Sequence, residues 1–355
     1  MLIIDSHLDL AWNAVSWNRD LTKTVAEIRR AEAGLIGQGR GQNTVAFPEM
    51  RRGEVGISLA TVLARASGLR EPLLDYQSRE IAYAVAQGQL AYYRIMESQG
   101  RLRMLRDGAS LGAHLTEWKT NPHANTPLGF IFSMEGADPI LSPAKVGEWW
   151  NAGLRVVGIV HYGANAYAHG TGEFGGLTAL GRDLLKAMDE IGMVLDVTHL
   201  ADESFWPAIE TYQCPILASH NNCRALVPGQ RQFSDEQMRA LIQRGAVIGT
   251  AFDVWMLSPG FIPGQTPNSA VSLEAVVDQI DHLCQLAGNS WHAAIGSDLD
   301  GGFGREQSPY DLDTIADLQK IPALLGKRGY KDEDVQAIMH GNWIRFFRTA
   351  WSCHN

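Results

Sequence analysis

The sequence has few cysteines, and they are widely separated. The four cysteines, Cys214, Cys223, Cys284 and Cys353, form no Cys-x-x-Cys pair. This spacing favours thiols in a reducing compartment over a disulfide framework. No secretory segment precedes the apolar residues that open the chain, and we therefore expect a cytoplasmic protein.

Long apolar runs and basic clusters are also missing. No apolar run approaches the roughly 18 residues that a membrane-spanning helix requires. The formal net charge is -9, and no basic stripe with interleaved aromatic residues is present to attract a phosphate backbone. We therefore expect neither a membrane nor a nucleic acid as a partner.

No linker rich in proline or serine divides the 355 residues, of which 45% are hydrophobic and 19% charged. This is the composition of a globular protein with a large core. An α/β barrel ranges from roughly 200 to over 400 residues, so we expect residues 1–355 to form a single catalytic domain. A polar segment at about 16–45 is expected to be an insertion of loop and helix. Its glycines follow neither of the phosphate-binding patterns that come after a strand.

Eight apolar segments of strand length alternate with helical patterns along the chain. The apolar segments are the opening residues 2–10 and residues 55–64, 128–134, 155–160, 193–198, 215–219, 246–251 and 293–297. Helical patterns occupy residues 21–33, 73–98, 111–119, 177–191, 234–245 and 273–286. Strands that are apolar throughout and alternate with amphipathic helices indicate a parallel sheet covered by helices. Eight repeats predict an α/β fold of the (β/α)8 TIM-barrel type, with an open doubly wound sheet as the alternative.

Polar residues end most of these apolar segments. In such a barrel the active site lies at the carboxyl ends of the strands, which gives these residues a functional interpretation. They are His7, Asp9, Glu135, His161, His199, His220 and Asp298. Taken singly, each histidine suits a hydrogen-bonded structural role. Taken together, four of the eleven histidines and three carboxylates meeting at one rim indicate a joint chemical function.

Imidazole nitrogen and carboxylate oxygen are the ligands that divalent first-row metal ions prefer. His7 and Asp9 lie two residues apart on one strand face and would bind one ion. His199 and His220 would bind the other, and Glu135 would bridge them. Two ions about 3.5 to 4 Å apart can share a hydroxide and polarise the bond that it attacks. The pattern therefore predicts a hydrolase with two divalent metal ions.

The motifs around these residues resemble those of the membrane (renal) dipeptidase family, binuclear zinc peptidases among the amidohydrolase-like barrels. The matching motifs, in the same order, are residues 5–12, Glu135-Gly136, His199, His220, residues 296–301 and the closing helix at 341–347. The resemblance covers the whole chain. It implies a zinc-dependent dipeptidase and makes zinc the expected metal.

The resemblance also implies roles for three residues in handling a small dipeptide. His161 would contact the substrate near the scissile carbonyl, and Arg231 would bind the terminal carboxylate. Asp298 would carry the proton that moves from the attacking water to the leaving amine. A planar guanidinium matches a carboxylate, and an aspartate beside metal-bound water can act as base and then as acid. Strand alternation would place Asp298 and Asp300 on a common face.

Departures from the family pattern bear on the substrate. Gln232 stands where asparagine is frequent, Ala11 where proline is frequent, and Phe252 lacks the hydroxyl of a tyrosine. Dipeptides, including those with a D-residue at the C-terminal position, are the first hypothesis. Hydrolysis of an N-acyl amino acid or a lactam on the same centre is the second, and a barrel that binds a metal or ligand without catalysis is the third. The intact set of metal-binding residues weighs against the third, and the sequence leaves open whether the chain forms a homodimer.

Overall fold

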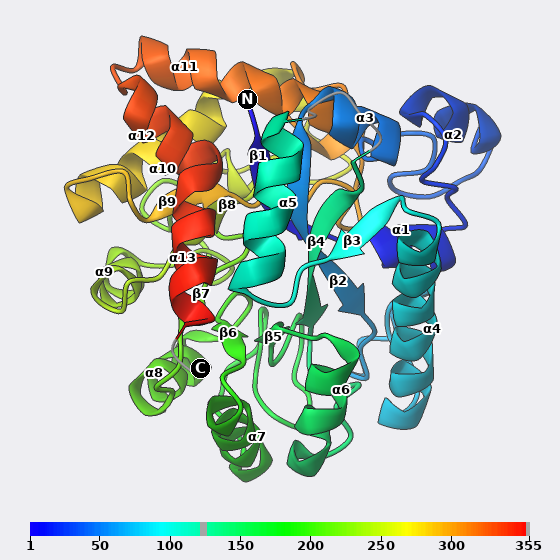
Figure 1. Ribbon diagram of the computed structural model, residues 1–355, viewed down its shortest axis with the longest axis vertical. Helices are drawn as coiled ribbons and strands as arrows, with labels where there is room; N and C mark the ends of the chain where they lie inside the picture. Colours follow the sequence, from blue (N-terminus) through cyan, green and yellow to red (C-terminus); the bar gives the residue numbers. More distant parts are fainter. Residues whose placement is uncertain (121–125, 353–355) are drawn as a thin grey trace.

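Eight parallel strands close into a barrel in the computed structural model, which describes residues 1–120 and 126–352 (Figure 1). The order around the sheet is β7-β6-β5-β4-β2-β1-β9-β8, and a parallel bridge between Ala218 and Ile248 joins its two ends. The barrel strands are β1 (Ile3–Leu8), β2 (Val55–Leu63), β4 (Leu128–Glu135), β5 (Val156–Gly158), β6 (Val194–Asp196), β7 (Ile216–Leu217), β8 (Ile248–Thr250) and β9 (Ala293–Ile295). The predicted barrel is confirmed, and each predicted apolar segment overlaps one of these strands.

A ninth strand, β3 (Leu102–Met104), was not predicted. It pairs only with the first residues of β4, from Leu128 to Phe130, and lies outside the closed ring. Three residues with an arginine at the centre are too short to show a strand pattern in the sequence.

Helices surround the barrel (Figure 1). They are α1 (Leu10–Val15), α2 (Val25–Ala31), α3 (Phe47–Arg52), α4 (Arg79–Ser98), α5 (Gly108–Thr120), α6 (Val146–Ala152), α7 (Ala179–Glu190), α8 (Asp202–Thr211), α9 (Asp235–Gln243), α10 (Glu274–Ala287), α11 (Ile321–Lys327), α12 (Asp332–Gln336) and α13 (Asn342–Ala350). The capping box predicted before α9 is present at Ser234. Helix α4 begins later than predicted, because Ser78 caps its first turn and Asp75 pairs with Arg65 in a short bridge.

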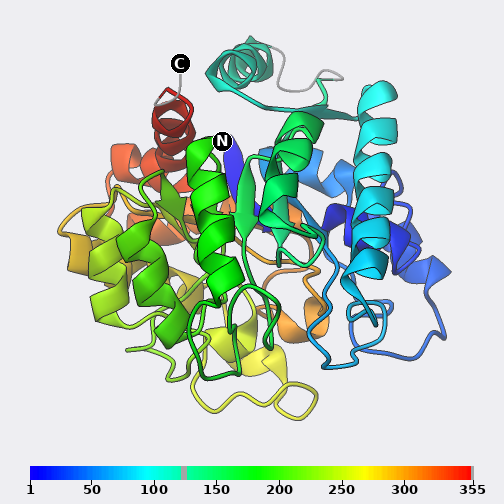
Figure 2. The ribbon, with the colours of Figure 1, turned by 90° about the horizontal axis from the view of Figure 1, so that it is seen from below.

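The amino-terminal half of the barrel interior is apolar, and the last helix closes it. Side chains from seven of the barrel strands, together with Val247 just before β8, form this cluster: Ile4, Ile57, Leu59, Ile131, Val156, Val194, Leu217, Val247 and Ala294. Helix α13 packs Trp343, Phe346 and Phe347 against them, and the indole N–H of Trp343 donates to the carbonyl of Ile295 at 3.1 Å. Figure 2 shows α13 and the start of β1 at one end of the molecule and long loops at the other. The carboxyl ends of the strands therefore face the loops.

The cysteines that the structure describes, Cys214, Cys223 and Cys284, are buried and form no disulfide with one another, as predicted. Cys353 lies outside the described residues. Among residues 1–120 and 126–352, no helix is long and apolar enough to cross a bilayer.

Candidate active site

The predicted site residues meet at the carboxyl ends of the strands. Glu135 is the last residue of β4, His7 lies in β1, and Asp9 immediately precedes α1. His161, His199, His220 and Asp298 each stand three residues beyond the end of β5, β6, β7 and β9, respectively. Closure of the barrel, and not proximity in the sequence, brings these side chains together.

Glu135 lies at the centre of the cluster. Its Oε1 is 3.2 Å from Nε2 of His199 and 3.3 Å from Nε2 of His220. Its Oε2 is 3.5 Å from Nε2 of His7, which is 3.7 Å from Oδ2 of Asp9. Two groups with the geometry for a metal ion share Glu135, namely His7–Asp9–Glu135 and Glu135–His199–His220. Oε1 of Glu135 thus faces His199 and His220, and Oε2 faces His7, which lies beside Asp9.

The donor atoms of this cluster fit a cation. Nε2 of His7 and Oε1 of Glu135 are buried and have no hydrogen-bond partner among the described residues. Leaving a buried polar atom unpaired costs about 1–3 kcal/mol, and a divalent ion would remove that cost. A third group, His7–His220–Asp298, has comparable geometry, which gives Asp298 a second candidate role as a ligand.

Hydroxyl groups orient three of the imidazoles. Nδ1 of His199 is 3.0 Å from Oγ1 of Thr171, and Nδ1 of His220 is 2.8 Å from Oγ of Ser219. Nδ1 of His7 lies 3.5 Å from the same serine oxygen. A histidine that binds a metal commonly uses its second nitrogen in this way, which fixes the ring and its tautomer. The Nε2 atoms of all three rings therefore face the carboxylate of Glu135.

Two residues of the cluster have a left-handed backbone. The φ angle is 69° at His199 and 59° at Asp298, a conformation that costs a residue other than glycine of order 1–3 kcal/mol. The surrounding structure holds the Asp298 segment in place through Asp5. The carboxylate of Asp5 accepts hydrogen bonds from the backbone N–H of Ser297 at 2.8 Å and of His7 at 3.2 Å. Asp5 thereby ties the end of β1 to the turn after β9.

The pKa values of His7 and Asp298 are both raised, for different reasons. Burial opposes a charge on His7, but Glu135 and Asp9 outweigh it and raise the pKa of His7 well above its ordinary value. Burial also raises the pKa of Asp298 well above its usual range, and the nearby carboxylates contribute to this. Metal ligands bind in their deprotonated forms, so the affinity of this site for a metal ion should fall with falling pH.

A cavity of about 180 Å³ opens over the cluster, and Arg231 lines it. Nη2 of Arg231 donates to the carbonyl of His220 at 3.0 Å, whereas its buried Nη1 has no partner among the described residues. A buried guanidinium with unused N–H groups suits a carboxylate ligand. His161 lines the same cavity, and burial lowers its pKa to about 3, with the charges of Arg65 and Arg231 contributing. The ring of His161 is therefore neutral.

Several residues of the cavity wall were not found from the sequence: Gln38, Arg65, Tyr162, Asp253 and Gln307. Arg65 and Asp253 stand just after β2 and β8, so the strand-end argument could have included both. The departure noted at Phe252 does not bear on the cavity, because that ring is buried in the core and its neighbour Asp253 lines the wall. Gln307 donates to both oxygens of Asp253 at 2.8 Å, and burial raises the pKa of Asp253 to about 7.

The prediction that Asp298 and Asp300 share a face is wrong. Strand β9 ends at Ile295, and both aspartates have a positive φ, so strand alternation does not apply. The carboxylate of Asp300 accepts hydrogen bonds from the backbone N–H of Thr44 at 2.7 Å and of Val45 at 3.0 Å. Asp300 thus anchors the end of the 16–45 segment, while Asp298 joins the cluster.

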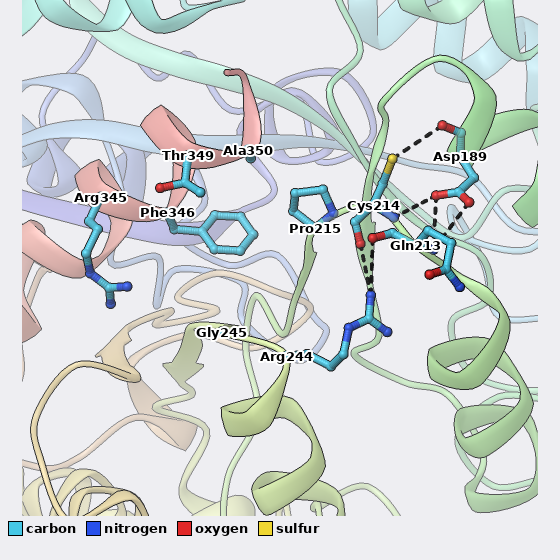
Figure 3. Close-up of a pocket in the computed structure, with 10 residues that line it drawn as sticks. All are labelled: Asp189, Gln213, Cys214, Pro215, Arg244, Gly245, Arg345, Phe346, Thr349 and Ala350. Carbon is cyan, nitrogen blue, oxygen red and sulfur yellow. Dashed lines mark hydrogen bonds between the residues drawn. The ribbon is translucent and has the colours of Figure 1, made fainter. Parts of the chain in front are cut away.

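A second cavity, of about 550 Å³, lies at the opposite end of the barrel (Figure 3). Arg244 donates there to the carbonyls of Tyr212 at 2.8 Å and Cys214 at 3.3 Å. The carboxylate of Asp189 accepts from the backbone N–H of Cys214 at 2.7 Å. These charged groups hold the chain that leads into β7. The charged groups named here serve the fold. Within the described part of the chain, the buried donor without a partner that lines a cavity is Nη1 of Arg231, at the carboxyl ends.

A barrel whose carboxyl end gathers histidines and carboxylates around one glutamate is of the amidohydrolase-like class. The whole chain, residues 1–355, matches the family described as Membrane dipeptidase (Peptidase family M19). The chain therefore belongs to this family of metallopeptidases, and the resemblance seen in its motifs is confirmed.

Individual proteins of similar sequence include a fungal dipeptidase and a bacterial protein. Dipeptidase tcpJ of Claviceps purpurea is 31% identical over 203 residues, which are 55% of this chain and 44% of that protein. An uncharacterized protein in the pqqA 5' region of Klebsiella pneumoniae is 29% identical over 267 residues, 72% of this chain and 92% of that protein. The aligned region spans about half the length of the curated dipeptidases that match.

Solved structures share the fold. A metallopeptidase from Rhodobacter sphaeroides, liganded with a phosphinate mimic of the dipeptide L-Ala-D-Ala, has a TM-score of 0.78 at 21% identity over 99% of both chains. The structure described as dipeptidase AC has a TM-score of 0.80 at 22% identity over 99% of both chains. The fold is therefore shared with known metallopeptidases, one of which is described as a member of family M19.

Proposed function

We propose that this protein hydrolyses the peptide bond of small dipeptides with the help of two divalent metal ions, and that the ions are zinc. The observation that carries this proposal is the position of Glu135 between two groups of candidate ligands. His7 and Asp9 would hold one ion, and His199 and His220 the other. When bound, such a pair supplies a hydroxide nucleophile at neutral pH and polarises the bond under attack.

Three side chains around the cluster would handle the substrate. The unused Nη1 of Arg231 would donate to the terminal carboxylate, and His161 would contact the scissile carbonyl. Asp298 lies 3.8 Å from Nε2 of His7 and would hold the proton that passes to the leaving amine. The position of each residue on the cavity wall supports these roles.

The size of the cavity favours a small substrate. Its volume of about 180 Å³ is below the roughly 300–1,000 Å³ of pockets that enclose drug-sized ligands. A dipeptide suits this space better than a longer peptide. Because the similar Rhodobacter sphaeroides protein is liganded with a mimic of L-Ala-D-Ala, we include L,D-dipeptides among the substrates.

The test combines a metal count with a substrate panel. The zinc-loaded protein should contain about two ions per chain, hydrolyse free L,L- or L,D-dipeptides and leave their N-acylated forms intact. Cleavage of N-acyl amino acids or lactams alone would replace the dipeptidase proposal by the other amidohydrolase reaction. A native protein with a single ion would contradict the shared role of Glu135.

Arg231 provides the second arm of the test. Arg231→Ala should raise KM for free dipeptides by roughly 10- to 100-fold, because charge-assisted hydrogen bonds contribute about 1.5–3 kcal/mol. A dipeptide with an amidated C-terminus is the matched control and should lose little. Equal losses for both substrates would show that Arg231 supports the structure and does not bind the carboxylate.

A further inference from the structure

One of the four strand-end histidines has a different partner from the other three. Nδ1 of His161 lies 2.9 Å from Nη1 of Arg65. A guanidinium group has only donors and keeps its charge in proteins. Nδ1 of His161 must therefore accept this hydrogen bond and carries no proton. The neutral ring then has its proton on Nε2.

The other three rings are arranged in the opposite way. The hydroxyl of Thr171 is 3.3 Å from the carbonyl of His199, to which it donates, and its oxygen can accept from Nδ1–H of His199. Ser219 offers a hydroxyl oxygen to His220 and His7 in the same manner. When they bind an ion, these rings would carry the proton on Nδ1 and present an Nε2 lone pair. His161 instead presents an N–H. It does so although its Nε2 lies 3.7 Å from Oε1 of Glu135, close to the position that the metal-binding candidates occupy.

Arg65 is held rigidly enough to impose this tautomer. Its Nε and Nη2 donate to the two oxygens of Asp75 at 3.1 and 2.6 Å, and Nη2 also donates to Glu71 at 2.8 Å. Its backbone N–H donates to the carbonyl of Leu74 at 2.9 Å. The side chains of Arg65 and Asp75 are 1% and 2% exposed, so water does not compete for the contacts between these two residues. Nη1 is the part of the guanidinium that remains for His161.

We propose that Arg65 is a positioning residue that fixes His161 as the Nε2–H tautomer, so that this ring donates a hydrogen bond to the oxygen of the scissile carbonyl as it gains negative charge. Preorganised donors aimed at such an oxygen are a major source of catalysis. His161 is then a substrate donor and not a metal ligand, although it ends a strand like His199 and His220. The catalytic part of this inference rests on the proposed function, whereas the tautomer does not.

The tautomer can be measured directly. Two-bond proton–nitrogen correlation spectra of the zinc-loaded, nitrogen-labelled protein distinguish the two neutral forms, and His161→Asn identifies the signal. The wild type should show a neutral His161 with its proton on Nε2. A proton on Nδ1, or a charged ring at neutral pH, would overturn the proposal. This readout requires no substrate and stays informative if no dipeptide is cleaved.

The variant Arg65→Met/Asp75→Asn removes the cation and its buried partner together, so that no unpaired charge remains in the core. It should release His161 into a mixture of tautomers and lower kcat for a dipeptide by roughly 10- to 100-fold, with zinc content unchanged. Adding His161→Asn should then cause little further loss, because residues that act as a unit are not additive. Losses that multiply, or a fall in kcat that tracks loss of zinc, would make Arg65 merely structural.

Two controls separate this effect from general damage. Asp75→Asn alone keeps Arg65 and its contact with Glu71, and should shift the His161 signal less than the double variant does. Arg79→Met removes a half-buried arginine that binds the carbonyl of Ile140 and the hydroxyl of Tyr167, outside the cavity, and should leave the His161 signal unchanged. A shift of the His161 signal in Arg79→Met would overturn the specific role of Arg65.

Discussion

The two ends of the barrel interior are formed by the same eight strands but differ completely in chemistry. At the amino end each strand, or for β8 the residue just before it, points an apolar side chain inward: Ile4, Leu59, Ile131, Val156, Val194, Leu217, Val247 and Ala294. Two positions further along the chain, within the strand or just beyond its end, stands a polar residue or a glycine: Ser6, Thr61, Ser133, Gly158, Asp196, Ser219, Gly249 and Gly296. Because side chains alternate along a strand, these two sets form successive layers. The metal cluster lies beyond the second layer.

Close packing across the barrel explains why the residues of the second layer are small. A Cβ atom at Gly296 would lie 1.9 Å from the carbonyl of Ser219, and one at Gly249 would lie 2.1 Å from it. The hydroxyl of Ser6 binds the carbonyls of Ser219 and Ile295 across this gap. In strand β4, Ile131 belongs to the apolar layer, Ser133 to the second layer and Glu135 to the metal cluster. A single strand therefore contributes to the core and to the active site within five residues. Changes at the two ends should therefore have separable effects, on stability at one end and on activity at the other.

The largest effect should come from Asp298→Asn at the carboxyl end. Asparagine keeps the size and polarity of the side chain but cannot accept the proton of the attacking water. Acid–base groups typically contribute about 10²- to 10⁴-fold, and kcat should fall by that factor with the metal content unchanged. Metal analysis and kcat measured on the same sample check this. Recovery of activity at high zinc would instead make Asp298 an ordinary ligand within the His7–His220–Asp298 group.

Asp300→Asn is the matched control for that change. Asp300 binds the backbone of Thr44 and Val45 and does not belong to the groups with metal-binding geometry. Its replacement should lower the melting temperature and change kcat much less than Asp298→Asn does. A loss of kcat as large as that of Asp298→Asn would show that the anchored segment shapes the site directly.

At the amino end, Trp343→Ala should reduce stability and spare catalysis. Trp343 is fully buried and packs against the apolar layer, and large-to-small changes of this kind cost about 3–5 kcal/mol. Denaturant unfolding should show this loss, while kcat/KM of the folded, zinc-loaded protein stays within about two-fold. Arg348→Ala, on the exposed face of the same helix, should change neither. A large fall in kcat/KM for Trp343→Ala would mean that the two ends are coupled.

The apolar layer was also the part most readily predicted from the sequence. Inward residues such as Ile131 and Val194 belong to continuous apolar runs, and eight such runs indicated the barrel. Helix α13 has a regular helical pattern, but only the family resemblance pointed to it. Helix α8 contains Pro207, and because proline disfavours a helix interior, helix propensity does not predict a helix there.

Of the site residues, the sequence predicted mainly those that follow the end of an apolar strand. Glu135, His199 and His220 follow apolar runs directly, so the topology of a barrel was enough to bring them together. Arg65 also follows such a run, but a lone arginine in a loop gives no sign that it binds His161, 96 residues away in the sequence. Gln38 and Gln307 meet from opposite ends of the chain. Contacts of this kind depend on loop conformation, which no local pattern specifies.

A smaller effect is expected for Thr171→Val, which replaces the hydroxyl beside Nδ1 of His199 with a methyl group. Partners of metal-binding histidines typically contribute 10- to 100-fold in metal affinity, and zinc should bind more weakly by about this factor. Zinc titration against a chelator measures it, and excess zinc should restore activity. Thr171→Ser keeps the hydroxyl and should keep the affinity. Weaker zinc binding in Thr171→Ser, with unchanged binding in Thr171→Val, would show that the methyl group, and not the hydroxyl, matters.

The smallest effect should be found where the 16–45 segment reaches the cavity. The side chain of Gln38 donates to Oε1 of Gln307 at 2.9 Å, and Gln307 in turn holds Asp253. A single neutral hydrogen bond contributes about 0.5–1.5 kcal/mol, so Gln38→Ala should raise KM by roughly 2- to 10-fold with kcat nearly unchanged. Lys23→Ala, an exposed change in the same segment, is the control and should alter neither constant. A rise in KM beyond about 100-fold would place Gln38 in direct contact with the substrate, and no change at all would mean that the segment covers the cavity without shaping it.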